Sequence, residues 1–474
     1  MFKKLVIIFG VIIIGLVIAL MMVDLNSYKP KIQQLVKESS GYDVKIAGNI
    51  GISFAPIGVS VHKVSITNPG EGTFAKLDSF DITLELMSLL KKEIKVNYIT
   101  LGKLDLTIEK LKNGKLNFEV DSPKKAKKET ISEAIQEKPV SQIKLRLINV
   151  TEVRVKDSNI NYKDLQINSE IKLQNINVVI NDIKLDSAKE KLQGIAFKGN
   201  VKIDTIAYDK YKIRNTSVEF DMKDAIANVT KMGYTIFDSA ASGTARVDLN
   251  GKFPKVALSQ NIPNLKLSNF SKEVLEKDLL DGVTNTDIKL AFVAGDLKQI
   301  KETLSGSVLF DGQKVTLKGY DLDKIAKTYN DTKDTKNLNL GSILTTVANA
   351  DINVGTTAVE HLHVKVDIDK RIARLSDIAI ATLKNRLAIK GSTDIVSESF
   401  NNVQVGLLDQ KGCANFSQTI QGTFSKPSIK VDEGMVNTVV NMATSFFGKV
   451  ANLGVAAKKD EPCKIFYNGV VKHS

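Results

Sequence analysis

Apolar and polar residues alternate at every second position in many parts of the 474-residue chain. In the stretch 80–86, for example, the even positions are apolar and the odd positions are polar. A period of two places alternate side chains on opposite faces of a strand, so this stretch predicts a strand with one wet face. Similar alternation occurs at 104–109 and 362–368. The apolar positions concerned are Phe80, Ile82, Leu84, Leu104, Leu106, Ile108, Leu362, Val364 and Val366.

These half-buried strands predict a mainly β protein with an antiparallel sheet. Turn signals separate them: Lys112-Asn113-Gly114-Lys115, Asp311-Gly312 and Asn68-Pro69-Gly70 supply residues that favour positive φ or a fixed proline φ. Short connections of this kind favour a meander, in which consecutive strands are neighbours.

The apolar phase slips by one residue at several points. Val61 is followed by Val64 in the apolar pattern, and Leu173 is followed by Ile176. A slip of one residue turns every later side chain to the other face unless a bulge absorbs it. We therefore expect bulges at these points and a curved sheet.

Predicted helices are few and short. The stretch 26–40 has an apolar side and ends at Gly41, and weaker candidates are 271–280 and 322–329. The strongest amphipathic pattern, at 434–450, predicts a helix packed against a sheet, with docking onto a membrane or partner as the alternative. The charged stretch 124–139 predicts a solvated insert or linker.

The N-terminus predicts a membrane anchor. Lys3 and Lys4 precede an uncharged apolar run from Leu5 to Val23, which as a helix would cover about 28 Å, close to the hydrocarbon thickness of a bilayer. A cleaved signal peptide is the alternative, but the run is long and ends without a small-x-small cleavage site. The two lysines favour a cytoplasmic N-terminus, with the rest of the chain across the membrane.

Composition adds two constraints. The net charge of +13 favours anionic partners, which include phospholipid headgroups and nucleic acid, and export of the chain would leave the headgroups as the accessible choice. Aromatic residues are only 6% of the chain and Trp is absent, so aliphatic side chains must form the core. Cys413 and Cys463 are the only cysteines, and in an oxidising compartment we expect them to form a disulfide rather than two separate buried thiols.

The sequence offers little catalytic chemistry. His361 and His363 lie on the same polar face of their predicted strand, at a spacing that a metal pair can use. No carboxylate or cysteine evidently converges on them, and with Lys365 close by we interpret them as exposed surface. The chain also lacks nucleotide-binding, serine-hydrolase and zinc-protease motifs. We therefore expect neither an enzyme, a metal site nor a cofactor.

Three segments carry a family resemblance. The first, 41–69, includes Gly-Asn-Ile-Gly-Ile-Ser-Phe-Ala-Pro and follows the anchor and short helix. The second, 309–322, has Leu-Phe-Asp-Gly followed by Leu-Lys-Gly-Tyr-Asp-Leu. The third is Gln-Gly-Thr-Phe-Ser-Lys-Pro-Ser-Ile at 421–429, between Cys413 and Cys463-Lys464-Ile465-Phe466-Tyr467. In this order, the segments resemble the AsmA family.

The resemblance implies a lipid carrier of the bacterial envelope, whose extended, curved antiparallel sheet forms an apolar groove between the inner and outer membranes. The partners expected are phospholipids, the inner membrane and a partner protein in either membrane, with no nucleic acid. From the residues alone, a closed β-sandwich is favoured over an open groove. The alternative function is a non-transporting scaffold or modulator of outer-membrane protein assembly.

The expected organisation has five parts. They are the anchor at 1–23, an N-terminal AsmA-like β region at 24–123, the linker at 124–139, a central β region at 140–300 and a C-terminal AsmA-like β region with a terminal helix at 301–474. The expected groove lining is the set of nine apolar residues from Phe80 to Val366 given above.

Overall fold

The computed structural model describes residues 24–54, 57–85, 96–119, 150–186, 189, 191–324, 326–327, 355–431 and 464–472. The predicted anchor, the charged linker at 124–139 and the predicted helix at 434–450 lie outside these residues. Within the described part of the chain, no helix is both long enough and apolar enough to cross a membrane.

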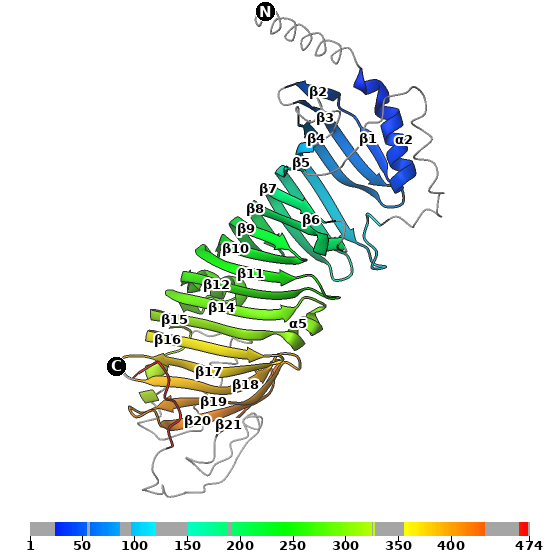
Figure 1. Ribbon diagram of the computed structural model, residues 1–474. Coiled ribbons are helices and arrows are strands. Elements are labelled where there is room, and N and C mark those ends of the chain that lie inside the picture. The colour runs from blue at the N-terminus through cyan, green and yellow to red at the C-terminus, as the bar shows by residue number, and fades with distance from the viewer. Residues whose placement is uncertain are drawn as a thin grey trace, which may run out of the picture. The chain divides into compact units, whose positions relative to one another are not determined.

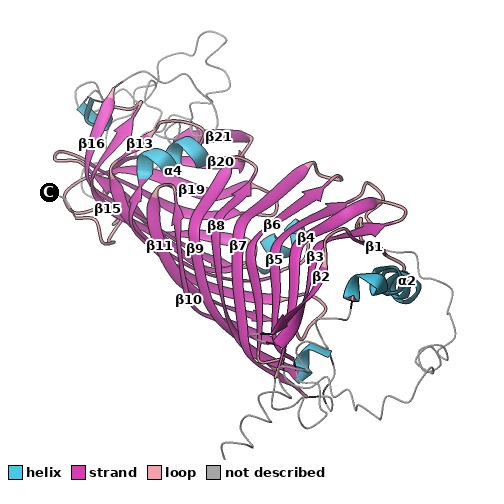
Figure 2. Cartoon of the chain, turned by 90° about the horizontal axis from the view of Figure 1, so that it is seen from above, coloured by secondary structure: helices cyan, strands magenta, loops and turns pink. Residues whose placement is uncertain are grey.

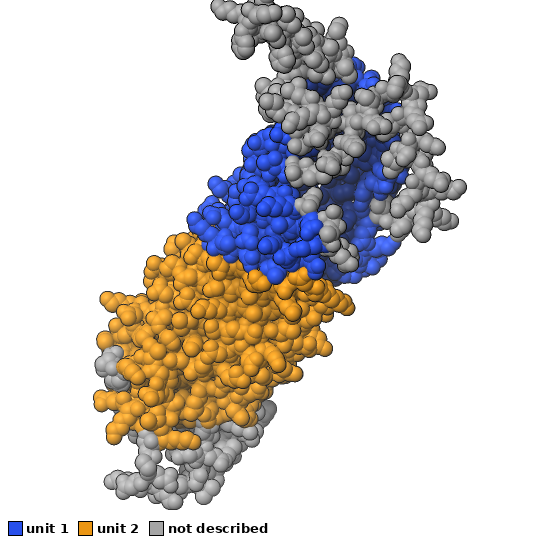
Figure 3. Space-filling model, in the orientation of Figure 1, with its two compact units in different colours: residues 1–232 blue, residues 233–474 orange. Residues whose placement is uncertain are grey.

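The prediction of a mainly β protein is confirmed. The described residues contain 21 strands assigned to one hydrogen-bonded sheet, together with a few short helices (Figure 1). The chain divides into two compact units, unit 1 at residues 1–232 and unit 2 at residues 233–474 (Figure 3). The boundary falls inside strand β10 (Ile226–Ile236), and each unit is described by itself.

In unit 1, β1 and β2 both pair with β3, and the strands β3 to β9 then pair in chain order. The elements are η1 (Leu25–Tyr28), α2 (Lys29–Ser40), β1 (Asp43–Ile46), β2 (Ile50–Phe54), β3 (Ile57–Asn68), β4 (Gly72–Leu84), β5 (Val96–Lys110), β6 (Glu152–Asp164), β7 (Ser169–Leu185), η2 (Lys191–Gly194), β8 (Ile195–Tyr208) and β9 (Tyr211–Lys223). The predicted helix at 26–40 is confirmed as η1 and α2, and its stop at Gly41 has a left-handed φ of 81°.

The meander is broken at one junction. Strands β5 and β6 pair in parallel, with Leu101 beside Val155 and Leu106 beside Ile160. A parallel neighbour requires a long crossover rather than a tight turn. The sequence prediction of antiparallel pairing is therefore wrong here, because the period of two is the same in parallel and antiparallel strands.

The predicted phase slips coincide with residues of left-handed conformation. Lys63 lies within the first slip with φ of 51°, and Asn175 lies within the second with φ of 53°. Lys103, Asp157 and Asn215 adopt the same conformation in β5, β6 and β9, with φ of 50°, 49° and 52°. These five residues form what we call the crease of unit 1. The pairing register shifts beside Ser158, where β6 meets the second slip on β7, as expected for a bulge. The register of β3 with β4 does not shift between Val61 and Val64, so the bulge expected at the first slip is absent from this pairing.

Polar side chains hold the crease on the face opposite the apolar pattern. Asn159 donates to Asp105 Oδ1 at 2.9 Å and accepts from the backbone N–H of Asn175 at 3.1 Å. The side chain of Asn175 in turn donates to Asp204 Oδ2 at 2.5 Å. Asparagine tolerates the left-handed region better than most residues. The crease is thus fixed by local conformation and by a polar ladder across the four strands β5 to β8, which lie side by side in Figure 2.

In unit 2, strands β11, β12, β14 and β15 to β21 pair antiparallel in that order, and the short β13 pairs with β15. The elements are β11 (Ser239–Asp248), β12 (Lys255–Lys266), α4 (Leu267–Val274), β13 (Leu280–Asp281), β14 (Val283–Val293), α5 (Leu297–Thr303), β15 (Ser305–Lys318), β16 (Thr356–Asp369), β17 (Ile372–Ala381), β18 (Arg386–Asp394), β19 (Ser399–Leu408), β20 (Ala414–Thr423) and β21 (Lys426–Val431).

Two local predictions in unit 2 need correction. Asp311-Gly312 lies inside β15 rather than in a turn, because both residues pair with β16. The helix expected at 271–280 runs instead from Leu267 to Val274 as α4. In unit 1, the turns predicted at 68–70 and 112–115 are present as turn or bend residues at 69–70 and 112–114.

The fully buried core of the described residues is concentrated in unit 2. One cluster is built on β18 to β20, where Val405 and Ile420 are 0% exposed and Phe416 is 1% exposed. A second cluster lies where Tyr467 and Val471 pack on small alanine side chains of β17 and β18. Among the described residues, unit 1 contains fewer fully buried apolar side chains than unit 2.

Candidate functional site

The apolar face of unit 1 is made of continuous cross-strand rows. Residues paired across neighbouring strands point to the same face, so the register identifies each row. One row crosses seven strands without a polar residue. It consists of Val61, Phe80, Leu101, Val155, Val178, Val201 and Val218.

Two further rows lie on either side of it. The first consists of Val59, Ile82, Ile99, Val153, Ile180, Gly199 and Phe220. The second, beyond the crease, consists of Ile66, Ala75, Leu106, Ile160, Leu173, Ile206 and Ile213. The left-handed residues of the crease absorb the phase slip, so the rows on both sides of the crease share one face of the sheet. The charged crease residues Lys63, Lys103 and Asp157 are exposed.

Most side chains in these rows are half-buried rather than buried. The helices η1 and α2 are tied to the short strands β1 and β2 at one end of unit 1: the Ile46 N–H donates to Gln33 Oε1 of α2 at 2.8 Å, and the Ile50 N–H donates to Asn26 Oδ1 of η1 at 2.9 Å. Among the described residues of unit 1, no helix packs across the three rows. The described residues therefore place no second layer over this apolar face, as a closed domain would place over a sheet.

The predicted groove residues of unit 1 lie in or beside these rows. Phe80, Ile82 and Leu106 belong to them directly, and Leu104 pairs with Leu77 between the crease and the row that contains Leu106. Leu84 and Ile108 pair with Val96 and Tyr162 near the strand ends. All six are half-buried.

Unit 2 covers part of its apolar face with short helices. Phe270 of α4 lies between Phe237 and Phe310, with ring centroids 5.6 and 5.7 Å apart. Leu267 of the same helix packs with Val315 and Val359. These contacts place α4 over the middle of the unit 2 sheet.

The three predicted groove residues of unit 2 fall at the edge of this cover. Leu362 packs against the cluster of Leu267 and Val315. Val364 and Val366 are half-buried and pair with Phe310 and Val308. The predicted lining is therefore partly open and partly packed in this unit.

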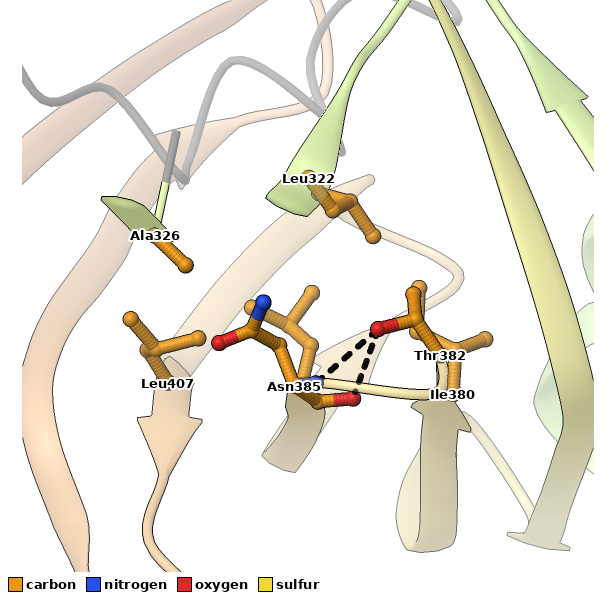
Figure 4. Close-up of a pocket in the computed structure, with 7 residues that line it drawn as sticks. Leu322, Ala326, Ile380, Thr382, Asn385 and Leu407 are labelled. Carbon is orange, nitrogen blue, oxygen red and sulfur yellow. Dashed lines mark hydrogen bonds between the residues drawn. The ribbon is translucent and has the colours of Figure 1, made fainter. Parts of the chain in front are cut away.

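Figure 4 shows a small pocket over strands β17 to β19 of unit 2. Leu322 and Ala326, from a short helical segment, lie over Ile380, Leu387 and Leu407. Thr382 closes one side through hydrogen bonds with the backbone of Asn385, at 2.9 Å from the Asn385 N–H and 3.3 Å to its carbonyl. The space left is too small for a lipid, so the short segment acts as a cover over the sheet.

Charged groups lie away from the apolar rows. Lys110 and Asp164 form an ion pair of 3.0 Å at the ends of β5 and β6. Burial raises the pKa of the Asp164 carboxyl, but the hydrogen bond from Lys110 and those from backbone N–H groups outweigh it and hold the pKa below its usual value. Asp164 therefore stays ionised at neutral pH, and the strand ends carry fixed charge of both signs.

The histidine pair differs from its sequence interpretation. His363 is buried rather than exposed, and Asp311 of the neighbouring strand lies within hydrogen-bond distance of both His361 and His363. The convergent carboxylate was missed because Asp311 was assigned to a turn and lies some fifty positions earlier in the sequence.

The C-terminal segment 464–472 lies beside Cys413. Ile465 forms a β-bridge with Cys413, and the N–H groups of Phe466 and Tyr467 donate to the Gly412 carbonyl at 2.9 and 3.0 Å. Cys413 is part of a disulfide. Cys463 lies outside the described residues, so its pairing with Cys413 stays a prediction that this neighbourhood supports.

Comparison with known proteins gives one match. The model of the AsmA family matches residues 1–204 and again residues 185–378. No curated protein and no solved structure matches the chain significantly. The two overlapping matches include all of unit 1 and the first part of unit 2.

Proposed function

This chain belongs to the AsmA family, and from that premise we propose that it carries phospholipid, with the acyl chains held on the apolar face of unit 1. The observation that carries the proposal is the set of three apolar rows that cross β3 to β9 with no helix of the described residues packed over them.

The dimensions of the face suit acyl chains. From Ile99 to Leu106, the band between the outer rows spans seven residue steps, or about 23 Å at about 3.3 Å per residue. Seven strands at about 4.8 Å spacing give about 29 Å in the other direction. The product, roughly 650 Å², reaches the upper end of the largest apolar patches on ordinary monomers, about 300–600 Å². One leaflet of a bilayer is only about 15 Å thick, so a lipid tail fits within the width of the band.

Lipid movement on such a face needs no catalytic residue. An acyl chain exchanges one apolar environment for another, while its headgroup stays hydrated at the open edge of the sheet. Lysines near the strand ends, such as Lys110 and Lys163, offer positive charge to a phosphate there, although each also has a carboxylate partner. We propose no enzymatic activity.

The setting that fits this role is the envelope of a bacterium with two membranes. The apolar run at 5–23 would anchor the chain in the inner membrane, and the β units would lie in the periplasm, where they would pass phospholipid between the membranes and maintain the outer membrane.

The test is lipid retention by matched variants. Val155 lies in the central apolar row, whereas the adjacent Lys156 is exposed. Full-length protein is purified in mild detergent, and co-purifying phospholipid is quantified by mass spectrometry for the wild type, Val155→Glu and Lys156→Glu. We expect the wild type and Lys156→Glu to retain phospholipid, and Val155→Glu to lose most of it, because a carboxylate on the apolar face is costly to bury.

Folding is controlled by circular dichroism and thermal melting of each variant. A folded wild type that holds no phospholipid above an unrelated anchored protein contradicts the proposal and favours the non-transporting scaffold. Equal retention by Val155→Glu and Lys156→Glu places the lipid elsewhere on the chain.

A further inference from the structure

Three side chains that are capable of binding a metal meet on β15 and β16 of unit 2. His363 pairs directly with Asp311 across the two strands, and His361 lies two residues away on the same face. Asp311 Oδ2 is 2.6 Å from His363 Nδ1 and 3.2 Å from His361 Nε2. The three ligand atoms all lie within 4.8 Å of one another.

A second carboxylate backs the buried histidine. Asp377 Oδ2 lies 3.8 Å from His363 Nε2, on the side of the ring away from Asp311. Asp377 is itself held in place, because the Tyr467 hydroxyl donates to its Oδ1 at 2.5 Å and the Val470 N–H donates to its Oδ2 at 3.2 Å. The His363 side chain is 8% exposed, so this arrangement is largely shielded from water.

We propose that Asp311, His361 and His363 bind a divalent transition metal ion of the zinc type, with a fourth position open to water or an external ligand. Two imidazoles and one carboxylate form a common set for Zn²⁺ with an open position. Bonds of about 2.0–2.1 Å in a tetrahedron place ligand atoms about 3.3 Å apart, close to the 3.2 Å between His361 and Asp311. The distance between His363 Nδ1 and Asp311 Oδ2 is 2.6 Å, and it needs to increase by less than 1 Å to admit the ion.

The position of Asp377 distinguishes a metal site from a simple hydrogen-bonded cluster. If His363 is neutral and donates from Nδ1 to Asp311, its Nε2 lone pair faces the Asp377 carboxylate. A metal ion bound to Nδ1 of His363 places the ring proton on Nε2 instead, so that an N–H group rather than a lone pair faces the Asp377 carboxylate. In metal centres the outer ring N–H of a histidine ligand usually donates to a carboxylate, and Asp377 Oδ2, at 3.8 Å, would have to approach His363 Nε2 by less than 1 Å to accept such a bond.

The ligand chemistry selects the class of ion. Imidazole nitrogen favours zinc, cobalt, nickel and copper, whereas calcium and magnesium favour sets of oxygen ligands. Bound metal would join β15 to β16 and, through Asp377 and Tyr467, the C-terminal segment. The ion would therefore cross-link these elements of unit 2, while its fourth position stays available to water or an external ligand.

The experiment measures zinc binding by untagged full-length protein in detergent. Metal is first removed with a chelator, the protein is equilibrated against buffered Zn²⁺, and bound zinc is quantified by mass spectrometry. We expect one Zn²⁺ per chain. His361→Ala and Asp311→Asn should weaken binding by more than about 100-fold, and Asp377→Asn by about 10- to 100-fold, the usual cost of losing an outer partner.

His62→Ala is the matched control, because His62 is an exposed histidine in unit 1. Its variant should bind zinc as the wild type does. Co²⁺ supplies a second readout, since a tetrahedral site gives an intense visible absorption band that should disappear in His361→Ala. Circular dichroism identifies any variant that fails to fold, and the half-exposed position of His361 makes that variant the primary test. Failure of the wild type to bind zinc, or equal binding by His361→Ala and the wild type, overturns the proposal.

Discussion

Leu101 on β5 and Val155 on β6 are partners in parallel register. Every other strand pairing described within the two units is antiparallel, yet the central apolar row crosses this junction without a polar residue. The continuity of the face therefore depends on register rather than on strand direction.

A photo-crosslinker tests which face meets lipid. A photoreactive amino acid at Leu101 lies in the central row, whereas one at Lys103 lies at the exposed crease two residues away. We expect light-dependent phospholipid adducts at Leu101 and few at Lys103, as measured by mass spectrometry of the purified chain. Adducts of equal yield at both positions would argue against a one-sided lipid face.

Truncation of apolar side chains should distinguish the buried core from the open face. Leu407→Ala removes a buried side chain of unit 2 and should lower the free energy of unfolding by about 3 kcal/mol. Leu101→Ala affects a half-buried side chain and should cost about 1 kcal/mol. Urea unfolding of lipid-free protein measures both values. A cost for Leu101→Ala as large as that for Leu407→Ala would mean that the unit 1 face is a closed core.

The crease should respond to substitution at Asn215, which has φ of 52°. Asn215→Val places a β-branched side chain in the left-handed region and should destabilise the protein by about 1–2 kcal/mol, whereas Asn215→Gly should be nearly neutral. Ser217→Val, at an exposed position of the same strand, is the control. Thermal melting compares the three variants with the wild type. An unchanged melting temperature for Asn215→Val would show that the crease does not need this backbone conformation.

The ion pair of Arg371 and Asp394 predicts a pH dependence. Hydrogen bonding from Arg371, which outweighs the effect of burial, together with bonds from the N–H groups of Val396 and Ser397, lowers the pKa of Asp394 to about 2 from its usual 3.8. Because the folded pKa lies below the unfolded one, this stabilisation is complete above about pH 4 and is lost as the pH falls through 2.

Asp394→Asn should therefore melt at a lower temperature than the wild type at pH 7, and the difference should shrink below pH 4. Melting curves at several pH values measure it, with Asp367→Asn in the same unit as the control. A difference that stays constant down to pH 2 would show that the charge of Asp394 does not cause the effect.

The predicted disulfide should tie down the C-terminal segment. Replacing Cys413 and Cys463 together by serine should lower the free energy of unfolding by about 2–4 kcal/mol, because the bridge closes a long loop in the unfolded chain. The same loss should appear when the wild type is unfolded with a reductant, and no further loss should appear in the double variant. If reduction leaves wild-type stability unchanged, the cysteines do not stabilise the fold as a bridge.

The sequence predicted what depends on local periodicity. Alternation predicted the strands that carry Phe80, Leu104 and Val364, and the phase slips after Val61 and Leu173 marked the two stretches in which Lys63 and Asn175 lie, although not their left-handed conformation. It could not show the parallel pairing of β5 and β6, because alternation carries no direction.

The metal-capable cluster was missed for a different reason. Asp311 meets His363 only through the pairing of two strands, and a glycine after Asp311 has the sequence character of a turn. Which part of the unit 2 sheet is covered likewise depends on where α4 packs, and no local sequence pattern determines that position. Lipid carriage and the envelope setting stay proposals.

The crease also determines how such a sheet can lengthen. Each of the strands β3 to β9 contributes one residue to each apolar row, so these strands are interchangeable units along the direction of pairing. An added hairpin would extend the apolar surface by about 10 Å and leave its cross-section unchanged. Length and width are therefore independent variables in this architecture: the number of hairpins sets the first, and the distance of the outer rows from the crease sets the second.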